Sequence, residues 1–371
     1  MQLIRQLGLA LLGAQLFFES SIAVAHNSYQ PEIKKRAPPE VENWALYKYW
    51  NSQIETSPYF CEAGFSADTG SLSRSGNVRS LSWGIGNCEE KIVSWDFKQT
   101  PIAKGEVSIW KATLKVKNSD GTEKSSKEVA LKRGSDARGI LFGANVQQKL
   151  SDNDNILGAL EAVVQNDEDG DPEWGNSIMP FVQASSLEKN LDSYSTQSLV
   201  NDAFKQILTA VSVVHGEGIM HRDLKPENFL VDGSILKLID FDTAFEGDST
   251  NAFNVGTRTY AAPEIVAMKT PSGGGYTKKI DVFSLGMTFL VMSVTDLQDD
   301  DTRFLLWKEL IEPNGELWPT VAKVSTLLKE KSYDVFSDNE NLLTVISTAL
   351  CTPDDRYDDA SAFQTAFNAA I

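Results

Sequence analysis

Polar and apolar residues alternate with a period of two over the stretch that begins near Ile102. Ala112, Leu114 and Val116 are separated by polar or charged neighbours, which is the pattern of a strand with one buried face. Residues 118–127 are polar and predict a hairpin loop, and residues 129–132 predict the next strand. Because side chains alternate between the faces of a strand, residues 130 and 132 are expected on the same face.

Farther along the chain the apolar spacing becomes that of helices. Residues 166–171 are acidic and resemble the start of a calcium loop, but no glutamate closes it, so we expect a connection between two strands. A strand is predicted at residues 178–182, and Phe204, Leu208 and Val211 have helical spacing. Residues 282–294 are apolar on every side but shorter than the ~20 residues of a membrane-spanning helix, which predicts a buried core helix.

The beginning of the chain has the pattern of a targeting segment. Arg5 precedes an apolar stretch, residues 7–18, and Ala25 ends a run of small residues, which predicts a secretory signal peptide over residues 1–25. The apolar stretch is too short for a signal anchor, so no membrane anchor is expected after cleavage. Residues 26–36 are a possible propeptide that ends in a dibasic site, although that charge run is equally typical of a solvated segment. The protein is expected to be secreted.

Residues 37–95 hold four of the eight tryptophans and a Gly/Ser-rich middle. They predict a small extension that packs its aromatic residues on the main body. Cys61 and Cys88 both lie in it, and passage through an oxidising compartment favours a disulfide between them. Cys351 is left over and is expected to be a buried small apolar residue.

The net charge of −17 constrains the partners. Removal of residues 1–36 takes away four basic and two acidic side chains and leaves −19. Nucleic acid and anionic membranes are poor partners for such a surface, whereas a basic protein substrate is favoured.

Eight consecutive residues, 221–228, carry the most specific chemistry in the chain. They read His-Arg-Asp-Leu-Lys-Pro-Glu-Asn and bring a candidate base, a cation and a metal ligand into one short loop. Phosphoryl transfer needs these groups, because an acid orients the incoming hydroxyl while cations neutralise the charge on the phosphate. A predicted strand then ends in Asp240-Phe241-Asp242, and Ala-Pro-Glu follows at residues 262–264.

This ordered set is similar to the catalytic part of the eukaryotic protein kinases. The lysine at position 225 makes the motif resemble that of the kinases that act on serine and threonine. The resemblance covers residues 96–371. It implies an α+β fold of two lobes, a small β-rich lobe and a large helical lobe. It also implies ATP and Mg²⁺ as cofactors and a protein as substrate.

The resemblance further implies roles for single residues. Asp223 and Lys225 are the implied catalytic residues, and Asn228 and Asp240 the implied Mg²⁺ ligands. The implied ATP-binding residues are Gly105, Val107, Ala130, Lys132, Met179, Phe181, Val182 and Leu230. Thr257 and Thr259 lie in the implied activation segment. The implied supporting residues are His221, Arg222, Phe241, Glu264, Asp281 and Arg356, with Glu264 paired to Arg356 and Asp281 anchoring the catalytic loop.

Three departures from the family pattern bear on activity. Only Gly105 remains of the glycines that let a backbone approach phosphates. No glutamate occurs between Glu128 and Glu161, so the helix glutamate that pairs with the strand lysine in the family is missing, at a position near Gly143 or Ala144. Lys132 is therefore expected to lack a partner. Asp242 replaces the family's glycine, which adds a carboxylate that raises local proton affinity or recruits a second cation.

Three functions follow from these observations. The intact catalytic loop favours an active Mg·ATP-dependent Ser/Thr protein kinase with reduced efficiency. The missing glutamate and glycines favour a secreted pseudokinase that serves as an interaction scaffold. A small-molecule phosphotransferase is disfavoured, because the related small-molecule kinases lack an activation segment of this kind.

Overall fold

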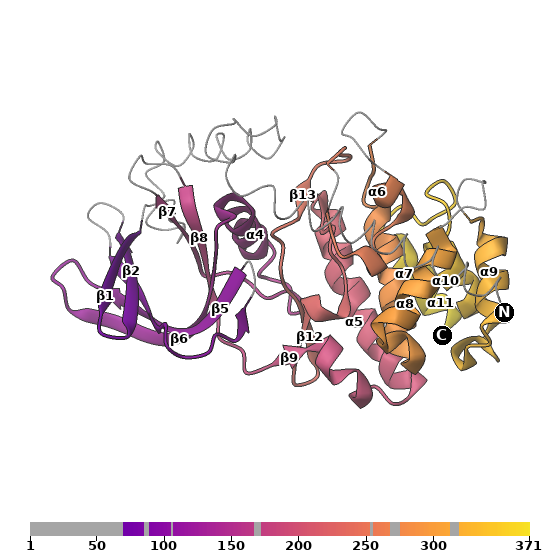
Figure 1. The fold of residues 1–371 in the computed structure, drawn as a ribbon, viewed down its shortest axis with the longest axis horizontal. Helices are drawn as coiled ribbons and strands as arrows, with labels where there is room; N and C mark the ends of the chain where they lie inside the picture. Colours follow the sequence, from indigo (N-terminus) through magenta and orange to yellow (C-terminus); the bar gives the residue numbers. More distant parts are fainter. Residues whose placement is uncertain are drawn as a thin grey trace, which may run out of the picture. The chain divides into compact units, whose positions relative to one another are not determined.

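The computed structural model describes residues 70–84, 89–104, 107–166, 172–252, 255–267, 275–311 and 319–371 (Figure 1). The predicted signal peptide and propeptide, the two cysteines of the expected disulfide and Gly105 lie outside these residues. The described residues form an antiparallel sheet followed by a helical part, and this α+β architecture confirms the expected fold class.

The sheet has eight strands, and all its pairs are antiparallel. Its strands are β1 (Ser71–Ser75), β2 (Val78–Gly84), β3 (Glu90–Asp96), β4 (Ala103–Lys104), β5 (Val107–Lys117), β6 (Glu123–Gly134), β7 (Glu161–Asn166) and β8 (Pro172–Pro180). Their order is β1-β2-β3-β5-β6-β8-β7, and the short β4 also pairs with β5.

The hairpin between β5 and β6 is tighter than the sequence predicts. Of the polar residues expected to form a loop, 118–127, the last five (123–127) belong to β6, and residues 118–122 connect the strands. Ion pairs such as Lys115 with Glu123 and Lys111 with Glu128 link exposed side chains across the hairpin. Polar residues can therefore form this strand because its outer end faces solvent.

Residues 70–96 are strands of the same sheet, so the boundary expected at residue 95 does not separate them from the main body. Strand β3 pairs with β5, and β2 pairs with β3. The Gly70 N–H donates to the Val164 carbonyl at 2.9 Å, which joins the segment before β1 to β7 at the other end of the strand order. The sheet thus curls around one apolar core, made of Leu81, Trp83, Val93, Trp95, Ala112, Leu114, Val129, Leu131, Val163 and Ile178.

One helix, α4 (Ala137–Lys149), packs on the sheet and contacts β7 and β8. The side chain of Asp136 caps it by accepting the Gly139 N–H at 3.1 Å. Two glycines, Gly139 and Gly143, lie one turn apart in it, and residues four apart share one side of a helix. This side faces the segment after Asp240.

The C-terminal part is mainly helical. Its helices are α5 (Gln197–Gly216), α6 (Pro263–Ala267), α7 (Lys279–Ser293), α8 (Asp300–Ile311), α9 (Val321–Glu330), α10 (Glu340–Ala349) and α11 (Ala360–Ala370). Its short strands are β9 (Ser185–Ser186), β10 (Ile219–Met220), β11 (Phe229–Asp232), β12 (Ile235–Leu238) and β13 (Phe245–Glu246), and its 3₁₀ turns are η1 (Leu187–Ser193), η2 (Pro226–Asn228), η3 (Arg258–Tyr260), η4 (Thr295–Gln298) and η5 (Asp334–Phe336).

The predicted core helix is α7, in which every residue from Ile280 to Met292 is buried. The ring of Phe204 on α5 packs edge-on against Phe289 and Phe367, with centroids 5.0 Å apart in both pairs. Aromatic packing of this kind fixes α5 and α7, which lie beneath the catalytic loop. Among the helices of the described segments, none has the length and apolar character that crossing a bilayer requires.

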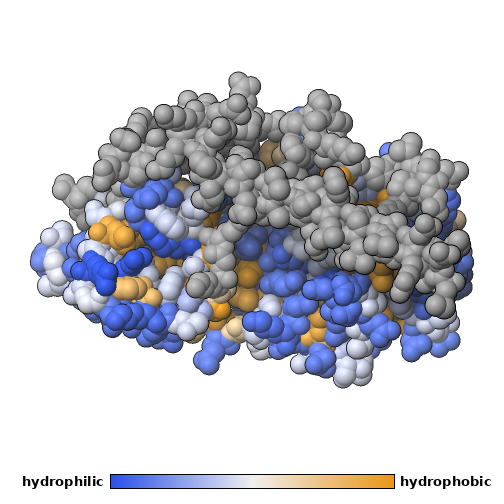
Figure 2. Space-filling view, in the orientation of Figure 1, coloured by the Kyte–Doolittle hydropathy of each residue, from blue (hydrophilic) through white to orange (hydrophobic). Residues whose placement is uncertain are grey.

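The coloured surface in Figure 2 is mainly hydrophilic, with apolar residues in small separate groups. Large apolar side chains with high exposure, such as Leu305 and Ile102, are far apart in the sequence. Small separate apolar groups are ordinary on the surface of a folded protein.

Candidate active site

The catalytic loop, residues 221–228, is held from below by Asp281 on α7. The Asp281 carboxylate accepts the backbone N–H groups of His221 and Arg222 at 2.7 and 2.8 Å. His221 is fully buried; its Nε2 donates to the Ile239 carbonyl at 3.1 Å, and its Nδ1 faces the Asp223 N–H at 3.3 Å. Burial lowers the pKa of His221, which fits the neutral ring that this pattern requires.

Asp223 and Lys225, the expected catalytic pair, lie side by side with Thr257 between them. The Lys225 Nζ is 3.1 Å from Asp223 Oδ2 and donates to Thr257 Oγ1 at 2.5 Å. The Thr257 hydroxyl in turn donates to Asp223 Oδ1 at 2.8 Å. A carboxylate, an ammonium and a hydroxyl therefore meet at one point, contributed by the catalytic loop and the activation segment.

Gly256 permits this close approach of the two segments. Its φ of +80° is in the left-handed region, and a Cβ there would lie 2.5 Å from the Arg222 carbonyl oxygen. A side chain at this position would push the activation segment away from the catalytic loop. Thr259 lies nearby in η3 and is partly buried, but no described contact joins it to Asp223.

The expected metal ligands, Asn228 and Asp240, present the oxygen atoms that Mg²⁺ prefers. Asn228 directs its amide nitrogen to the Asp223 carbonyl at 2.7 Å, which leaves its Oδ1 for a cation. The Ile239 N–H donates to the Asn228 carbonyl at 2.9 Å and so places the following residue, Asp240, beside the loop. The Asp240 side chain is 41% exposed, and its backbone has a φ of 65°.

This donor set fits Mg²⁺ held together with a nucleotide. Mg²⁺ usually takes one or two protein carboxylates and completes its shell with water and phosphate oxygens. No group of three or more His, Cys, Asp or Glu side chains suited to caging a metal occurs in the part of the chain that the structure describes. Asn228 and Asp240 together offer one amide oxygen and one carboxylate for such an ion.

Lys132 has two carboxylate partners, contrary to the expectation that it lacks one. Its Nζ lies 2.5 Å from Asp240 Oδ1 and 2.7 Å from Asp242 Oδ1, and its side chain is only 8% exposed. Burial lowers the pKa of Lys132, but the charges of the two aspartates outweigh burial and raise it overall. Burial, the largest cause, together with repulsion from Asp240 raises the pKa of Asp242 to about 6 although Lys132 opposes this shift.

Four of the expected ATP-binding residues meet in one apolar cluster. Strand pairing places Ala130 directly opposite Met179, so both side chains lie on the same face of the sheet as Lys132. The cluster holds Ala130, Met179, Val182 and Leu230, together with Ala144, Leu157, Ala159, Ala162, Leu141 and Ile239. An apolar cluster on the same face of the sheet as Lys132 is suited to contact the heterocycle of a ligand that carries phosphates.

The other expected residues of this pocket lie outside the cluster. Val107 is partly buried at the start of β5, in register with Gly134. The Phe181 ring lies under the ammonium of Lys111, 4.6 Å from the ring centroid. Phe241, one of the expected supporting residues and not an expected ATP contact, is fully buried, and its ring lies 4.7 Å from that of His221.

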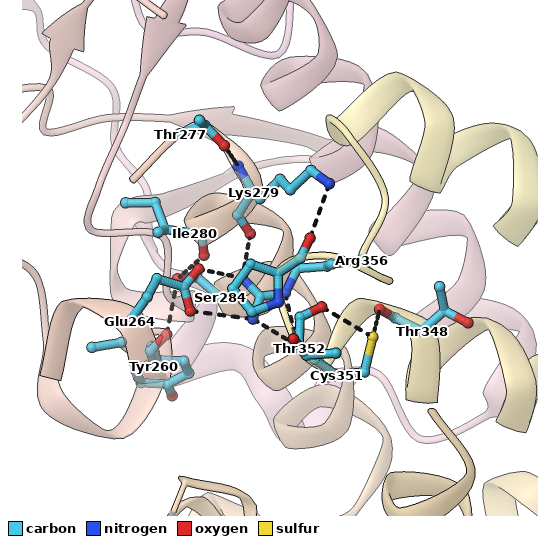
Figure 3. Close-up of polar contacts among 12 residues, drawn as sticks. Tyr260, Glu264, Thr277, Lys279, Ile280, Ser284, Thr348, Cys351, Thr352 and Arg356 are labelled. Atoms are coloured by element: carbon cyan, nitrogen blue, oxygen red, sulfur yellow. Dashed lines mark hydrogen bonds and ion pairs between the residues drawn. The ribbon is translucent and has the colours of Figure 1, made fainter. Parts of the chain in front are cut away.

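Glu264 and Arg356 form the expected ion pair, which Figure 3 shows in the helical part. Arg356 Nη1 donates to Glu264 Oε1 at 2.6 Å, and Nη2 to Oε2 at 3.3 Å. The guanidinium also donates to the carbonyls of Cys351 and Lys279. Because the arginine side chain is fully buried, this two-point contact fixes the end of the activation segment on the helical core.

Arg222 is engaged by the segment that follows Phe241. Its Nη1 donates to the Tyr276 hydroxyl at 3.1 Å, and its other nitrogens donate to the carbonyls of Thr243 and Ala244.

Two contacts of the site were not predicted from the sequence. Sequence reasoning missed Tyr276 because it is distant in the chain. It also missed the pairing of Asp242 with Lys132, although Asp242 itself was visible as a departure from the family.

Comparison with known proteins agrees with this geometry. The protein kinase domain model matches residues 103–351. The maternal embryonic leucine zipper kinase of Xenopus laevis is 32% identical over 148 residues, which are 38% of this chain and 22% of the relative. The interferon-induced, double-stranded RNA-activated protein kinase of Rattus norvegicus is 41% identical over 105 residues (27% and 20%), and the CBL-interacting protein kinase 30 of Oryza sativa subsp. japonica is 35% identical over 118 residues (30% and 24%).

These matches cover only about a fifth to a quarter of the length of the curated relatives. The family model, in contrast, matches more than half of this chain and includes the catalytic loop, Lys132 and the Asp240 segment. The chain belongs to the protein kinase family.

Proposed function

We propose that this chain is a Mg·ATP-dependent protein kinase that transfers phosphate to serine or threonine. The observation that carries the proposal is the contact of Thr257 with both Lys225 and Asp223. The Thr257 hydroxyl joins the two side chains, and the Asp223 carboxylate lies 3.1 Å from the Lys225 ammonium. A protein that needed only the fold would have no use for this arrangement.

The residues of the chain divide the chemistry among themselves. Asp223 orients the incoming hydroxyl and accepts its proton, while Lys225 places a positive charge beside the transferred group. Asn228 and Asp240 would hold Mg²⁺, and Lys132 would hold the phosphates. Mg·ATP, when bound, supplies the phosphoryl group.

Substrate preference and rate are part of the proposal. A net charge of −17 favours a basic protein substrate. Turnover is reduced because a loop with a single glycine clamps phosphates less closely.

The test of this function is an assay that measures the transfer of radiolabelled phosphate to a basic test protein and to an acidic one. The comparison is between wild type and Asp223→Asn, which keeps the shape of the side chain and removes the base. We expect transfer to the basic protein, on serine or threonine, and a loss of roughly 10²–10⁴-fold in the variant. Nucleotide binding without transfer would favour the pseudokinase scaffold, and equal transfer by both proteins would exclude Asp223 as the base.

We further propose that the protein is secreted, with residues 1–25 removed and Cys61 joined to Cys88. The support is the sequence of the leader and the pairing that an oxidising route favours. N-terminal sequencing and non-reducing peptide mapping of protein recovered from the medium test both points. A link from either cysteine to Cys351 would contradict the pairing.

A further inference from the structure

We propose that Asp242 is the positioning residue for Lys132 and performs the task that a helix glutamate performs elsewhere in the family. The inference rests on the proposed function and concerns how this chain aligns the lysine for the nucleotide. It starts from the 2.7 Å contact between Lys132 Nζ and Asp242 Oδ1.

The structure of α4 explains why the carboxylate comes from another segment. A Cβ at Gly143 would lie 2.9 Å from Asp242 Oδ1 and 2.9 Å from the carbonyl carbon of Phe241. A Cβ at Gly139, one turn earlier, would lie 3.0 Å from the Asp242 carbonyl oxygen. At Gly143 the helix thus approaches the 241–242 backbone too closely for a side chain without a shift, and Asp242 occupies the space beside it.

Of the two positions that align with the missing glutamate, Gly143 faces the 241–242 segment that carries Asp242. Ala144 packs instead in the apolar cluster with Leu157 and Met179. A glutamate restored at position 143 would collide with the Phe241 backbone as well as with Asp242. The two departures from the family pattern therefore fit together. Gly143 leaves room for the 241–242 segment, and Asp242 on that segment supplies the carboxylate that the helix lacks.

Asp240 and Asp242 both contact Lys132, and the two carboxylates can serve different roles. Asp240 would also hold Mg²⁺, and a carboxylate shared with a cation would hold Lys132 less tightly. Asp242 then remains as the carboxylate that orients Lys132. Removal of Asp242 should therefore matter most when metal and nucleotide are both present.

The test measures nucleotide affinity by calorimetry, with Mg²⁺ and with EDTA, in the full chain. The variants are Asp242→Asn, which is isosteric, and Asp242→Gly, which restores the family's residue. Asp136→Asn is the matched control, because it removes one nearby carboxylate that caps α4 without contacting Lys132, and asparagine is also a good cap. Thermal unfolding without ligand checks that each variant is folded.

We expect Asp242→Asn to weaken ATP binding about 10-fold or more with Mg²⁺ and by about 3-fold or less with EDTA, since hydrogen bonds between charged groups are the strong ones. Asp242→Gly should be at least as harmful, and Asp136→Asn should be neutral. In a Lys132→Met background, Asp242→Asn should cause no further loss, because a residue that acts through the lysine has no effect without it.

Three results would overturn the proposal. Asp242→Gly binding as tightly as wild type would mean that the aspartate is only a tolerated departure from the family. An additive loss in the Lys132→Met background would show that Asp242 acts on the fold and not through the lysine. If wild type binds no nucleotide under either condition, the proposed kinase function fails and this inference fails with it, a result distinct from the other two.

Discussion

The carboxylate of Asp281 accepts a hydrogen bond from Nε2 of His215 at 3.0 Å, and both side chains are buried beneath the catalytic loop. His215 Nδ1 accepts the backbone N–H of Ala360 at 3.0 Å, so the ring is neutral with its proton on Nε2. Burial alone would raise the pKa of Asp281, but the hydrogen bonds from His215 and the His221 backbone outweigh burial and lower it. Asp281 is thus ionised, the form that accepts hydrogen bonds only.

Asp281→Asn should loosen the catalytic loop. The new amide donates where a carboxylate oxygen accepted, which leaves a buried N–H of the loop without an acceptor at a cost of roughly 1–3 kcal/mol. We expect a lower midpoint of urea unfolding and a loss of phosphate transfer. Asp358→Asn, at a side chain that is 87% exposed, is the control and should change neither. Equal behaviour of the two variants would contradict the anchoring role of Asp281.

The Thr257 hydroxyl should matter for turnover more than for folding. Thr257→Val keeps the shape but removes the link between Lys225 and Asp223, and we expect kcat to fall about 10-fold to 100-fold. Thr257→Ser keeps the hydroxyl and should retain most of the activity. Initial rates at saturating ATP, with a thermal unfolding control, separate the two. If valine and serine variants had the same kcat, the hydroxyl would have no role in aligning the pair.

Metal dependence should reside in Asp240. Asp240→Ala removes a metal ligand, so the extra thermal stabilisation that Mg²⁺ gives to the ATP complex should disappear. A ligand present at 100 times its Kd stabilises by about 2.7 kcal/mol, which is readily measured as a shift in Tm. Wild type with EDTA is the reference for the metal-free state. A variant that still gains stability from Mg²⁺ would place the metal elsewhere.

The strands before the kinase-type hairpin should contribute to stability. Leu81 on β2 is fully buried in the apolar core of the sheet. Leu81→Ala should therefore lower the free energy of unfolding by about 2–5 kcal/mol. Leu72→Ala is the matched control in β1, because Leu72 is 42% exposed. The measurement is urea unfolding of both variants. A cost at Leu81 no larger than at Leu72 would show that residues 70–96 are dispensable to the sheet.

The Cys351 thiol should be unreactive in the folded protein. It is fully buried, and burial raises its pKa to about 11. Because folding favours the neutral thiol, its stabilising contribution is full below the ordinary pKa of 9.0 and is lost as the pH rises through about 11. Intact mass after iodoacetamide treatment at pH 8 should show no label on Cys351 without urea and one label with it. Labelling of Cys351 without urea would contradict the buried position.

The catalytic loop could be predicted from the sequence because its functional groups are neighbours in the chain. Residues 221–228 carry Asp223, Lys225 and Asn228 within one short segment, and the structure holds them together. The strand alternation likewise predicted that Ala130 and Lys132 share a face. Local pattern is sufficient wherever the relevant spacing is a property of one element.

The partners of Lys132 could not be predicted in this way. Its contact with Asp242 depends on how closely α4 approaches the 241–242 backbone, and Gly143 in the sequence gives no sign of what lies against it. For residues 70–96 a signal was present, because Leu81 and Trp83 alternate with serines, and Ser94 separates Val93 from Trp95. Their register with β5 required the tertiary structure.

The two carboxylates that face Lys132 flank a single buried ring, that of Phe241. Because residues 240 and 242 are the immediate neighbours of this ring, a displacement of the Phe241 backbone would move both carboxylates that contact Lys132. A carboxylate partner of Lys132 placed on a helix would instead be separate from the segment that carries Asp240. A ligand that displaced the Phe241 ring would therefore be expected to disturb both carboxylate contacts of Lys132 at once.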